Sequence, residues 1–159
     1  MPDMLRDLFG HEAWADAELL RAVQGCEPAA IDEDVRNRLR HAHETQQWFL
    51  AFVKGEAVAR PGEATPELSF DEFAASMRRY QAGVREVLDT ASAEWLDSVL
   101  TFPYGRHSQV TRREALLQVA LHSQNHRGQN LRRLKELGAE LRPLDYVVWV
   151  IKGRPDPQW

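Results

Sequence analysis

Residues 111–138 form one amphipathic pattern that is long enough to indicate the fold class. Thr111 and Glu114 have the spacing of a helical capping box, and Gly138 is placed as a helix stop. Between them the apolar residues recur at three- and four-residue steps, which is the period of an α-helix. These residues are Ala115, Leu116, Val119, Ala120, Leu131, Leu134 and Leu137. The segment is therefore predicted to be one long helix.

Three further segments show the same period. The apolar pattern predicts helices over residues 3–24 and 30–54, each followed by a glycine. Ser69 and Glu72 repeat the capping-box spacing and open a helix over residues 69–90. Four long helices with apolar sides indicate an all-α fold, an up-and-down or crossover four-helix bundle.

The remaining segments are less regular. Residues 55–68 are rich in Gly, Pro and Glu and are predicted to be a loop. Residues 92–110 fit either an extended excursion with a turn at Tyr104-Gly105 or a long connection. Residues 144–153 fit a short helix or a strand, because their β-branched content leaves the period undecided. We expect this C-terminal segment to pack on the bundle.

Composition excludes several classes of protein. The chain has 159 residues, within the size of one domain, so a single domain over residues 1–159 is expected. Its 43% hydrophobic and 28% charged residues are typical of a globular protein. The formal charge of −4 is spread over mixed acids and bases, which argues against a nucleic-acid partner.

The N-terminus and the single cysteine bear on location. Residues 1–14 carry acids and no unbroken apolar run, so no signal peptide is predicted. No stretch approaches the ~20 apolar residues of a membrane span. Cys26 has no partner for a disulfide, and we favour a structural role for it over a catalytic thiol. The expected location is the cytoplasm, with no membrane partner.

His122 and His126 are spaced four residues apart on the last predicted helix. Side chains at this spacing lie on one face, so two imidazoles can converge on one ion, as in zinc-binding HExxH helices. Here the intervening residues are Ser-Gln-Asn, and the absence of the glutamate excludes the metalloprotease interpretation. The spacing alone fits an exposed pair of polar residues as well as a metal site. The pair continues a side of the helix that begins with Ala115 and Val119, which favours the metal site.

A metal site needs a third ligand, and the second predicted helix contains His41 and His43. Residues two apart point in roughly opposite directions, about 200° around the helix axis, so only one of them can face the bundle interior. His41 shares its side with Thr45, Trp48 and Phe52, which favours His41. His11 and His107 are candidates for a fourth ligand, but a surface position is the preferred interpretation of both.

Four segments resemble the DinB-like (damage-inducible, YfiT-like) family of metalloenzymes. "LFGHEAWADAELL" resembles that family's first-helix motif, and "LRHAHETQQWFLAF" its second, with a ligand histidine followed five residues later by an acid or amide. Counting back from Gln46, this spacing again selects His41. "LHSQNHRGQN" is similar to the family's most specific motif, H-x-x-x-H-R-G-Q, and "RPLDYVVWVI" to its closing segment. The motifs occur in the family's order over most of the chain.

The resemblance implies a four-helix bundle that holds a divalent metal through His41, His122 and His126, with the remaining coordination open. It also implies a homodimer and a small-molecule substrate. Family members with assigned reactions include bacillithiol transferases and mycothiol-dependent isomerases, so the substrate could be a low-molecular-weight thiol. Gln129 is a candidate to orient a ligand, as is Asp145. Arg127 is predicted to contact an anionic group or a helix terminus.

These implications leave more than one function open. The first is a metal-dependent thiol transferase or a hydrolase that uses metal-activated water. The second is a non-catalytic, stress-associated bundle in which the ion stabilises the fold, and the third is a bundle that binds no metal. Imidazole binds several ions, and zinc or nickel is expected, with iron as an alternative.

Overall fold

The computed structural model is a bundle of four long helices, and it describes residues 2–57, 62, 67–103 and 108–159. The long helices are α1 (Pro2–Gln24), α3 (Glu33–Lys54), α4 (Phe70–Thr90) and α6 (Arg112–Glu136). They agree with the four helices predicted from the apolar period, which confirms the all-α fold.

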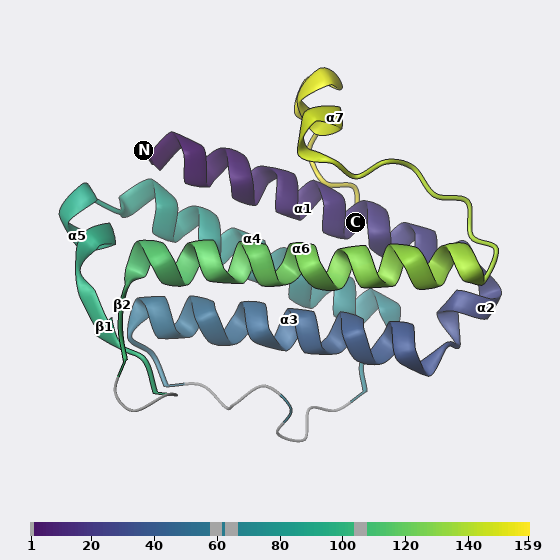
Figure 1. Cartoon of the computed structure of the whole chain (residues 1–159), viewed down its shortest axis with the longest axis horizontal. Coiled ribbons are helices and arrows are strands. Elements are labelled where there is room, and N and C mark those ends of the chain that lie inside the picture. Colours follow the sequence, from purple (N-terminus) through teal and green to yellow (C-terminus); the bar gives the residue numbers. More distant parts are fainter. Residues whose placement is uncertain (1, 58–61, 63–66, 104–107) are drawn as a thin grey trace.

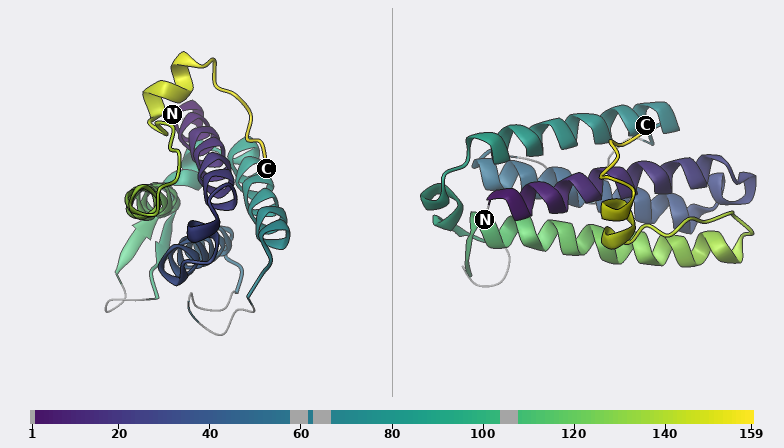
Figure 2. Two further views of the ribbon diagram at one scale, coloured as in Figure 1. Left: turned by 90° about the vertical axis from the view of Figure 1, so that its right-hand side faces the viewer. Right: turned by 90° about the horizontal axis from the view of Figure 1, so that it is seen from above.

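The connectivity is of the crossover kind. Helices α1 and α6 run in one direction and α3 and α4 in the other, so residues 55–69 join opposite ends of the bundle (Figure 1). Helix α3 packs against α6 and α4, and α1 packs against the same two helices. Helices α1 and α3 therefore lie diagonally opposite (Figure 2). As a result, α3 presents one side to α6 and another to α4.

Side-chain caps define the ends of the long helices. Ser69 and Glu72 form a complete capping box on α4, and Thr111 and Glu114 form another on α6, as their spacing predicted. One boundary was wrong. The helix predicted over residues 30–54 begins at Glu33, because the Asp32 side chain accepts a hydrogen bond from the Val35 amide and caps it there, and a separate short helix, α2 (Glu27–Ala30), precedes it.

The shorter elements resolve the segments that the sequence left open. Before α6 the chain forms α5 (Ala93–Asp97) and an antiparallel pair of strands, β1 (Val99–Thr101) and β2 (Gln109–Thr111), with Leu100 opposite Val110. The extended excursion is therefore confirmed, whereas its predicted turn at Tyr104-Gly105 lies outside the described residues.

The C-terminal segment is a helix, α7 (Tyr146–Ile151), and it packs on α1. Its Trp149 is buried against Gly10, where an added Cβ would lie 3.1 Å from the indole ring. A larger residue at position 10 would therefore force α7 away from α1. The expectation that this segment packs on the bundle is confirmed.

Two apolar clusters fill the bundle. One joins the first half of α1 to the second half of α3 and includes Leu5, Phe9, Trp48 and Phe49. The other joins the second half of α1 to the start of α3 and includes Trp14, with Trp149 of α7 packed in the same cluster. Trp14, Trp48 and Trp149 are core residues.

A layer of buried polar side chains lies between the two clusters, at the middle of the helices. It contains Glu12, Asp16, His43, Gln46, Ser76, Gln81, Ser123, Arg127 and Asn130. Buried polar groups are costly unless they are hydrogen-bonded, so this layer needs an internal network. Among the helices that the structure describes, none is both long and apolar enough to cross a membrane.

Candidate metal centre

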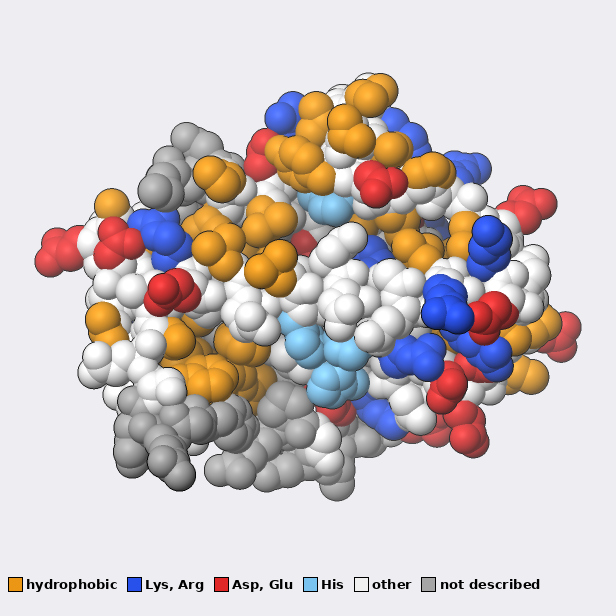
Figure 3. All heavy atoms as spheres, viewed as in Figure 1, with side chains coloured by type: hydrophobic (Ala, Val, Ile, Leu, Met, Phe, Trp, Pro, Cys, Tyr) orange, Lys and Arg blue, Asp and Glu red, His pale blue; other side chains and the backbone are white. Residues whose placement is uncertain are grey.

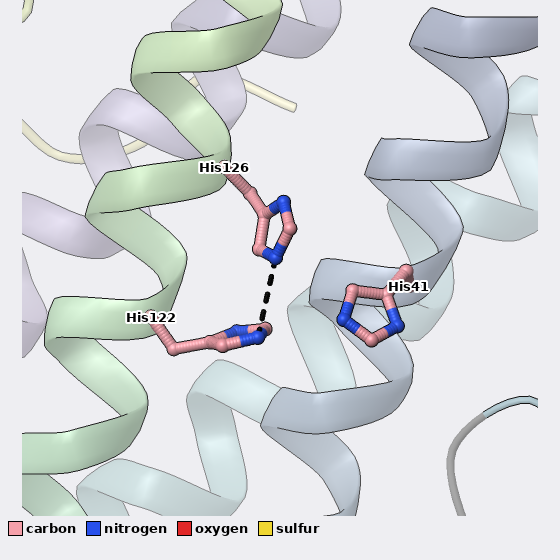
Figure 4. A group of neighbouring side chains, drawn as sticks. All are labelled: His41, His122 and His126. Atoms are coloured by element: carbon pink, nitrogen blue, oxygen red, sulfur yellow. Dashed lines mark hydrogen bonds between the residues drawn. The ribbon is translucent and has the colours of Figure 1, made fainter.

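Three histidines from two antiparallel helices meet at the surface of the bundle. His41 of α3 points toward α6, where His122 and His126 lie one above the other (Figure 4). One ring nitrogen from each residue lies within 4.8 Å of the others. The His41 ring centroid is 5.3 Å from that of His122 and 4.9 Å from that of His126. The i, i+4 pair and the favoured partner on the second long helix are thus adjacent.

The donor set fits a divalent metal ion. The Nε2 atoms of His122 and His126 are 3.2 Å apart (Figure 4). Two imidazole nitrogens bound tetrahedrally at about 2.0–2.1 Å would be separated by roughly 3.3 Å, so this pair is already spaced for ligation. His41 is exposed, and a small side-chain rotation can bring its nitrogen in.

Gln129 orients one of the rings. Its side-chain carbonyl lies 3.1 Å from Nδ1 of His126, which places the proton on Nδ1 and leaves the Nε2 lone pair facing the other histidines. The prediction that Gln129 orients a ligand is consistent with this contact. Asp145 is exposed at the start of α7 and has no hydrogen bond to these histidines among the described contacts.

Burial and mutual repulsion favour the neutral, ligating form of the imidazoles. Burial, and after it the nearby His126 and His41, together lower the pKa of His122 to about 4. Burial and His41 also lower the pKa of His126. Both rings therefore keep their lone pairs at neutral pH, as metal binding requires.

The site is open to solvent. His41 is exposed and the other two histidines are half-buried. In the space-filling view, a pale-blue patch of histidine side chains lies over α3 and α6 (Figure 3). A small molecule can therefore reach the three rings without any rearrangement of the helices.

His43 is not part of this group. It is buried on the opposite side of α3, where its Nε2 lies 2.8 Å from the Ser76 hydroxyl and its Nδ1 lies 3.2 Å from Gln46 Oε1. The two histidines diverge because they lie two positions apart on one helix, about 200° around its axis. The structure thus places His41, rather than His43, beside the α6 pair.

The two remaining histidines, His11 and His107, were considered as a fourth ligand. His11 is only 5% exposed, so the predicted surface position was wrong. Its Nε2 donates to the backbone carbonyl of Leu144 at 2.8 Å, and burial lowers its pKa. His11 is therefore a packing residue between α1 and the chain that leads to α7. His107 lies outside the described residues.

Behind the histidines, the buried polar layer holds two carboxylates and one guanidinium. Glu12 and Asp16 both accept hydrogen bonds from Gln46 Nε2, at 3.1 and 2.9 Å. Arg127, which follows His126, is 3% exposed and forms an ion pair with Asp16 at 3.4 Å. Arg127 therefore contacts a buried acid of α1 and is directed away from the open side of the histidine site.

Burial and the charge of Asp16 raise the pKa of Glu12 to about 7. Arg127 offsets only one of the two negative charges, so the layer favours a proton on Glu12 near neutral pH.

The sequence interpretation missed Glu12 and Asp16, although a signal for them was present. Both are buried on α1 between Phe9 and Leu19, at positions where the helical period would place apolar residues. Acids at positions that the period assigns to the core indicate a buried polar network.

Comparison of the sequence with known protein families identifies a match. A model of the DinB family matches residues 1–153. The chain belongs to the DinB family. No curated protein and no solved structure matches this DinB chain. The family match covers the four long helices and α7, and so includes every residue of the histidine group.

Proposed function

We propose that this DinB protein binds a divalent metal through His41, His122 and His126 and acts as a metal-dependent enzyme. The convergence of three imidazole nitrogens within 4.8 Å at an accessible surface carries the proposal. Zinc or nickel suits the nitrogen donor set, and iron is an alternative. The reaction class is thiol transfer to an electrophile, or hydrolysis.

A bound divalent ion with an open position would lower the pKa of a thiol or of water to near neutrality. The chain supplies the rest of the site. The low pKa values of His122 and His126 keep both lone pairs available, and Gln129 holds the His126 ring in one tautomer. The Asp16–Arg127 ion pair joins α1 to α6 next to His126, which limits movement of the ligand-bearing helix.

The surface position of the site bears on the substrate. His41 is exposed, and His122 and His126 are half-buried. This arrangement suits a small molecule, such as a low-molecular-weight thiol, that approaches from solvent. The second candidate function is a non-catalytic bundle whose ion stabilises the fold, and the same convergence of histidines supports it.

Metal analysis of the purified protein tests the ligand set. We expect about one equivalent of zinc or nickel in the wild type, and a loss of most of it in His41→Ala, His122→Ala and His126→Ala. His43→Gln is the matched control, because this histidine lies on the same helix and points away from the group. Full metal retention in the three alanine variants, or loss only in His43→Gln, would contradict the proposed ligands.

Turnover assays separate the enzyme from the binding protein. The metal-loaded protein is mixed with small thiols and a panel of electrophilic acceptors, and thioether formation is followed. We expect turnover that is abolished by chelation and by His122→Ala. If no acceptor is consumed while one metal equivalent remains bound, the non-catalytic function is favoured.

The homodimer that the family resemblance implies is also proposed. Exposed apolar side chains on α7 support it, since Tyr146, Val147 and Ile151 are 43%, 58% and 78% exposed. Hydrophobic side chains gather over this helix in the space-filling view (Figure 3). Light scattering on a size-exclusion column is expected to give twice the chain mass, and Val147→Glu with Ile151→Glu is expected to shift it to the monomer.

A further inference from the structure

A cavity lies between α3 and α4, on the side of α3 that faces away from His41. Its volume is about 390 Å³, within the range of small-molecule sites. Leu39, Phe70 and Phe73 form apolar walls, and the polar side chains of His43, Gln47 and Ser76 line it as well. None of the three proposed metal ligands lines it.

At the polar end of the cavity, the neighbours of Gln46 and His43 determine which of their atoms donate and which accept. Gln46 Nε2 faces the carboxylates of Glu12 and Asp16, so it must be the amide nitrogen, and its Oε1 faces His43. His43 Nδ1 therefore donates to Gln46. It follows that His43 Nε2 is an acceptor.

That assignment also determines the hydrogen bonds of Ser76 and Gln47, which contact His43 Nε2. Ser76 Oγ lies 2.8 Å from His43 Nε2 and so donates its only proton to it. Gln47 Nε2 lies 2.8 Å from Ser76 Oγ and 3.0 Å from His43 Nε2, and it donates to Ser76 Oγ, because the single lone pair of His43 Nε2 is taken by the Ser76 proton. The hydroxyl proton of Ser76 and the Nδ1 proton of His43 are therefore both used within the cluster.

What remains for a ligand is acceptor capacity. Ser76 Oγ keeps one lone pair, and the Gln47 carbonyl oxygen has no hydrogen bond among the described contacts. A ligand group that donates an O–H or N–H can therefore bind there. A carboxylate is disfavoured at these two oxygens, because it would place one acceptor against another there.

The charged residues at the cavity balance one another. Arg36 forms an ion pair with Glu67, and Glu44 accepts from the backbone amide of Gly62 at 2.9 Å. Arg40 donates to the Asn37 side chain. The lining thus contributes two positive and two negative side chains, Arg36 and Arg40 against Glu44 and Glu67, which favours an uncharged ligand.

We propose that the cavity between α3 and α4 binds an uncharged small molecule with an aromatic body and one O–H or N–H donor. The body packs between Leu39, Phe70 and Phe73, and the donor bonds to the Gln47 carbonyl or to Ser76. The site is separate from the histidine group and does not depend on its metal or on the reaction proposed for it.

The probe is 2-naphthol, with 2-methoxynaphthalene and 2-naphthoate as matched ligands that lack the donor or add a charge. Binding to the full chain at pH 7 is followed by calorimetry and naphthol fluorescence. We expect saturable binding of 2-naphthol with a Kd below about 1 mM and a Kd roughly tenfold higher for each of the other two, since one hydrogen bond is lost. The same values are expected with and without a chelator.

Two variants locate the binding. Gln47→Met removes the carbonyl acceptor at similar volume and is expected to weaken 2-naphthol about tenfold while leaving 2-methoxynaphthalene within about twofold. Phe70→Ala removes part of the apolar wall and is expected to weaken both ligands alike. Gln118→Met, on the exposed side of α6, is the control and should change neither.

Circular dichroism and a melting curve show that each variant is folded. Absence of saturable 2-naphthol binding, equal Kd values for the three ligands in the wild type, or unchanged binding in both Gln47→Met and Phe70→Ala would overturn the proposal. If one of these two variants does not fold, the other still decides, because each makes its own prediction.

Discussion

Glu12 is a carboxyl group with 1% of its surface exposed, in a layer that also holds Asp16. Burial and the neighbouring negative charge raise its pKa to about 7, far above the value of an unfolded chain. The folded protein therefore binds a proton more tightly here than the unfolded chain does. The contribution of Glu12 to stability is fully present below about pH 4.5 and is lost as the pH rises through about 7.

Glu12→Gln is expected to reduce this pH dependence. The amide stays uncharged, so the free energy of unfolding should fall less between pH 5 and pH 8 than in the wild type, by an amount on the order of 1–3 kcal/mol. Urea unfolding at several pH values, with a chelator present, measures it. Glu94→Gln, an exposed residue of α5, is the control. Parallel pH profiles for Glu12→Gln and the wild type would contradict the assignment.

Gly128 is exposed in the middle of α6, and a Cβ built there meets nothing within 4 Å. Among the described residues, no neighbouring helix therefore approaches closely enough to require glycine here. Its backbone φ is not among the positive values, so alanine fits without strain. Gly128→Ala is expected to stabilise the protein by roughly 0.5–1 kcal/mol, measured by chemical unfolding. A loss of stability would mean that this stretch of α6 requires glycine for another reason.

At the scale of elements, Asp32 joins two helices. Its side chain caps α3 through the Val35 amide and also accepts from Arg133, near the end of α6, at 2.7 Å. These two hydrogen bonds lower the pKa of Asp32, that from Arg133 more strongly. One residue thus starts α3 and fixes it against the end of α6.

Two substitutions separate these roles. Asp32→Asn keeps a capping oxygen but loses the ion pair, which is largely a surface pair, so a loss below about 1 kcal/mol is expected. Asp32→Ala removes both and is expected to cost about 1–2 kcal/mol. Chemical denaturation of both variants measures the difference, and equal losses would assign the effect to the ion pair alone.

At the scale of the whole molecule, the histidine group bridges α3 and α6, so an ion bound there stabilises the folded bundle. Ligand that binds only the folded chain adds about 2.7 kcal/mol at a hundred times its Kd. Zinc or nickel is therefore expected to raise the Tm of the metal-free protein by several degrees, in scanning calorimetry. The same ion should leave the Tm of His122→Ala nearly unchanged. An equal rise in both proteins would place the ion elsewhere.

The sequence by itself determined the four long helices, most of their caps and the pairing of His122 with His126. These depend on period, on capping spacing and on positions four residues apart, all of which are local along the chain. The choice of His41 over His43 rested on the wrong reason, because His43 is the buried residue of the two and His41 is exposed beside α6.

Only the tertiary structure decided what those helices enclose. The ion pair of Arg127 with Asp16 joins residues far apart in the chain, and the burial of His11 depends on the segment that precedes α7. The cavity beside His43 exists because α3 and α4 run side by side. Such features depend on which faces meet, and the packing of distant segments, rather than the local period, sets that.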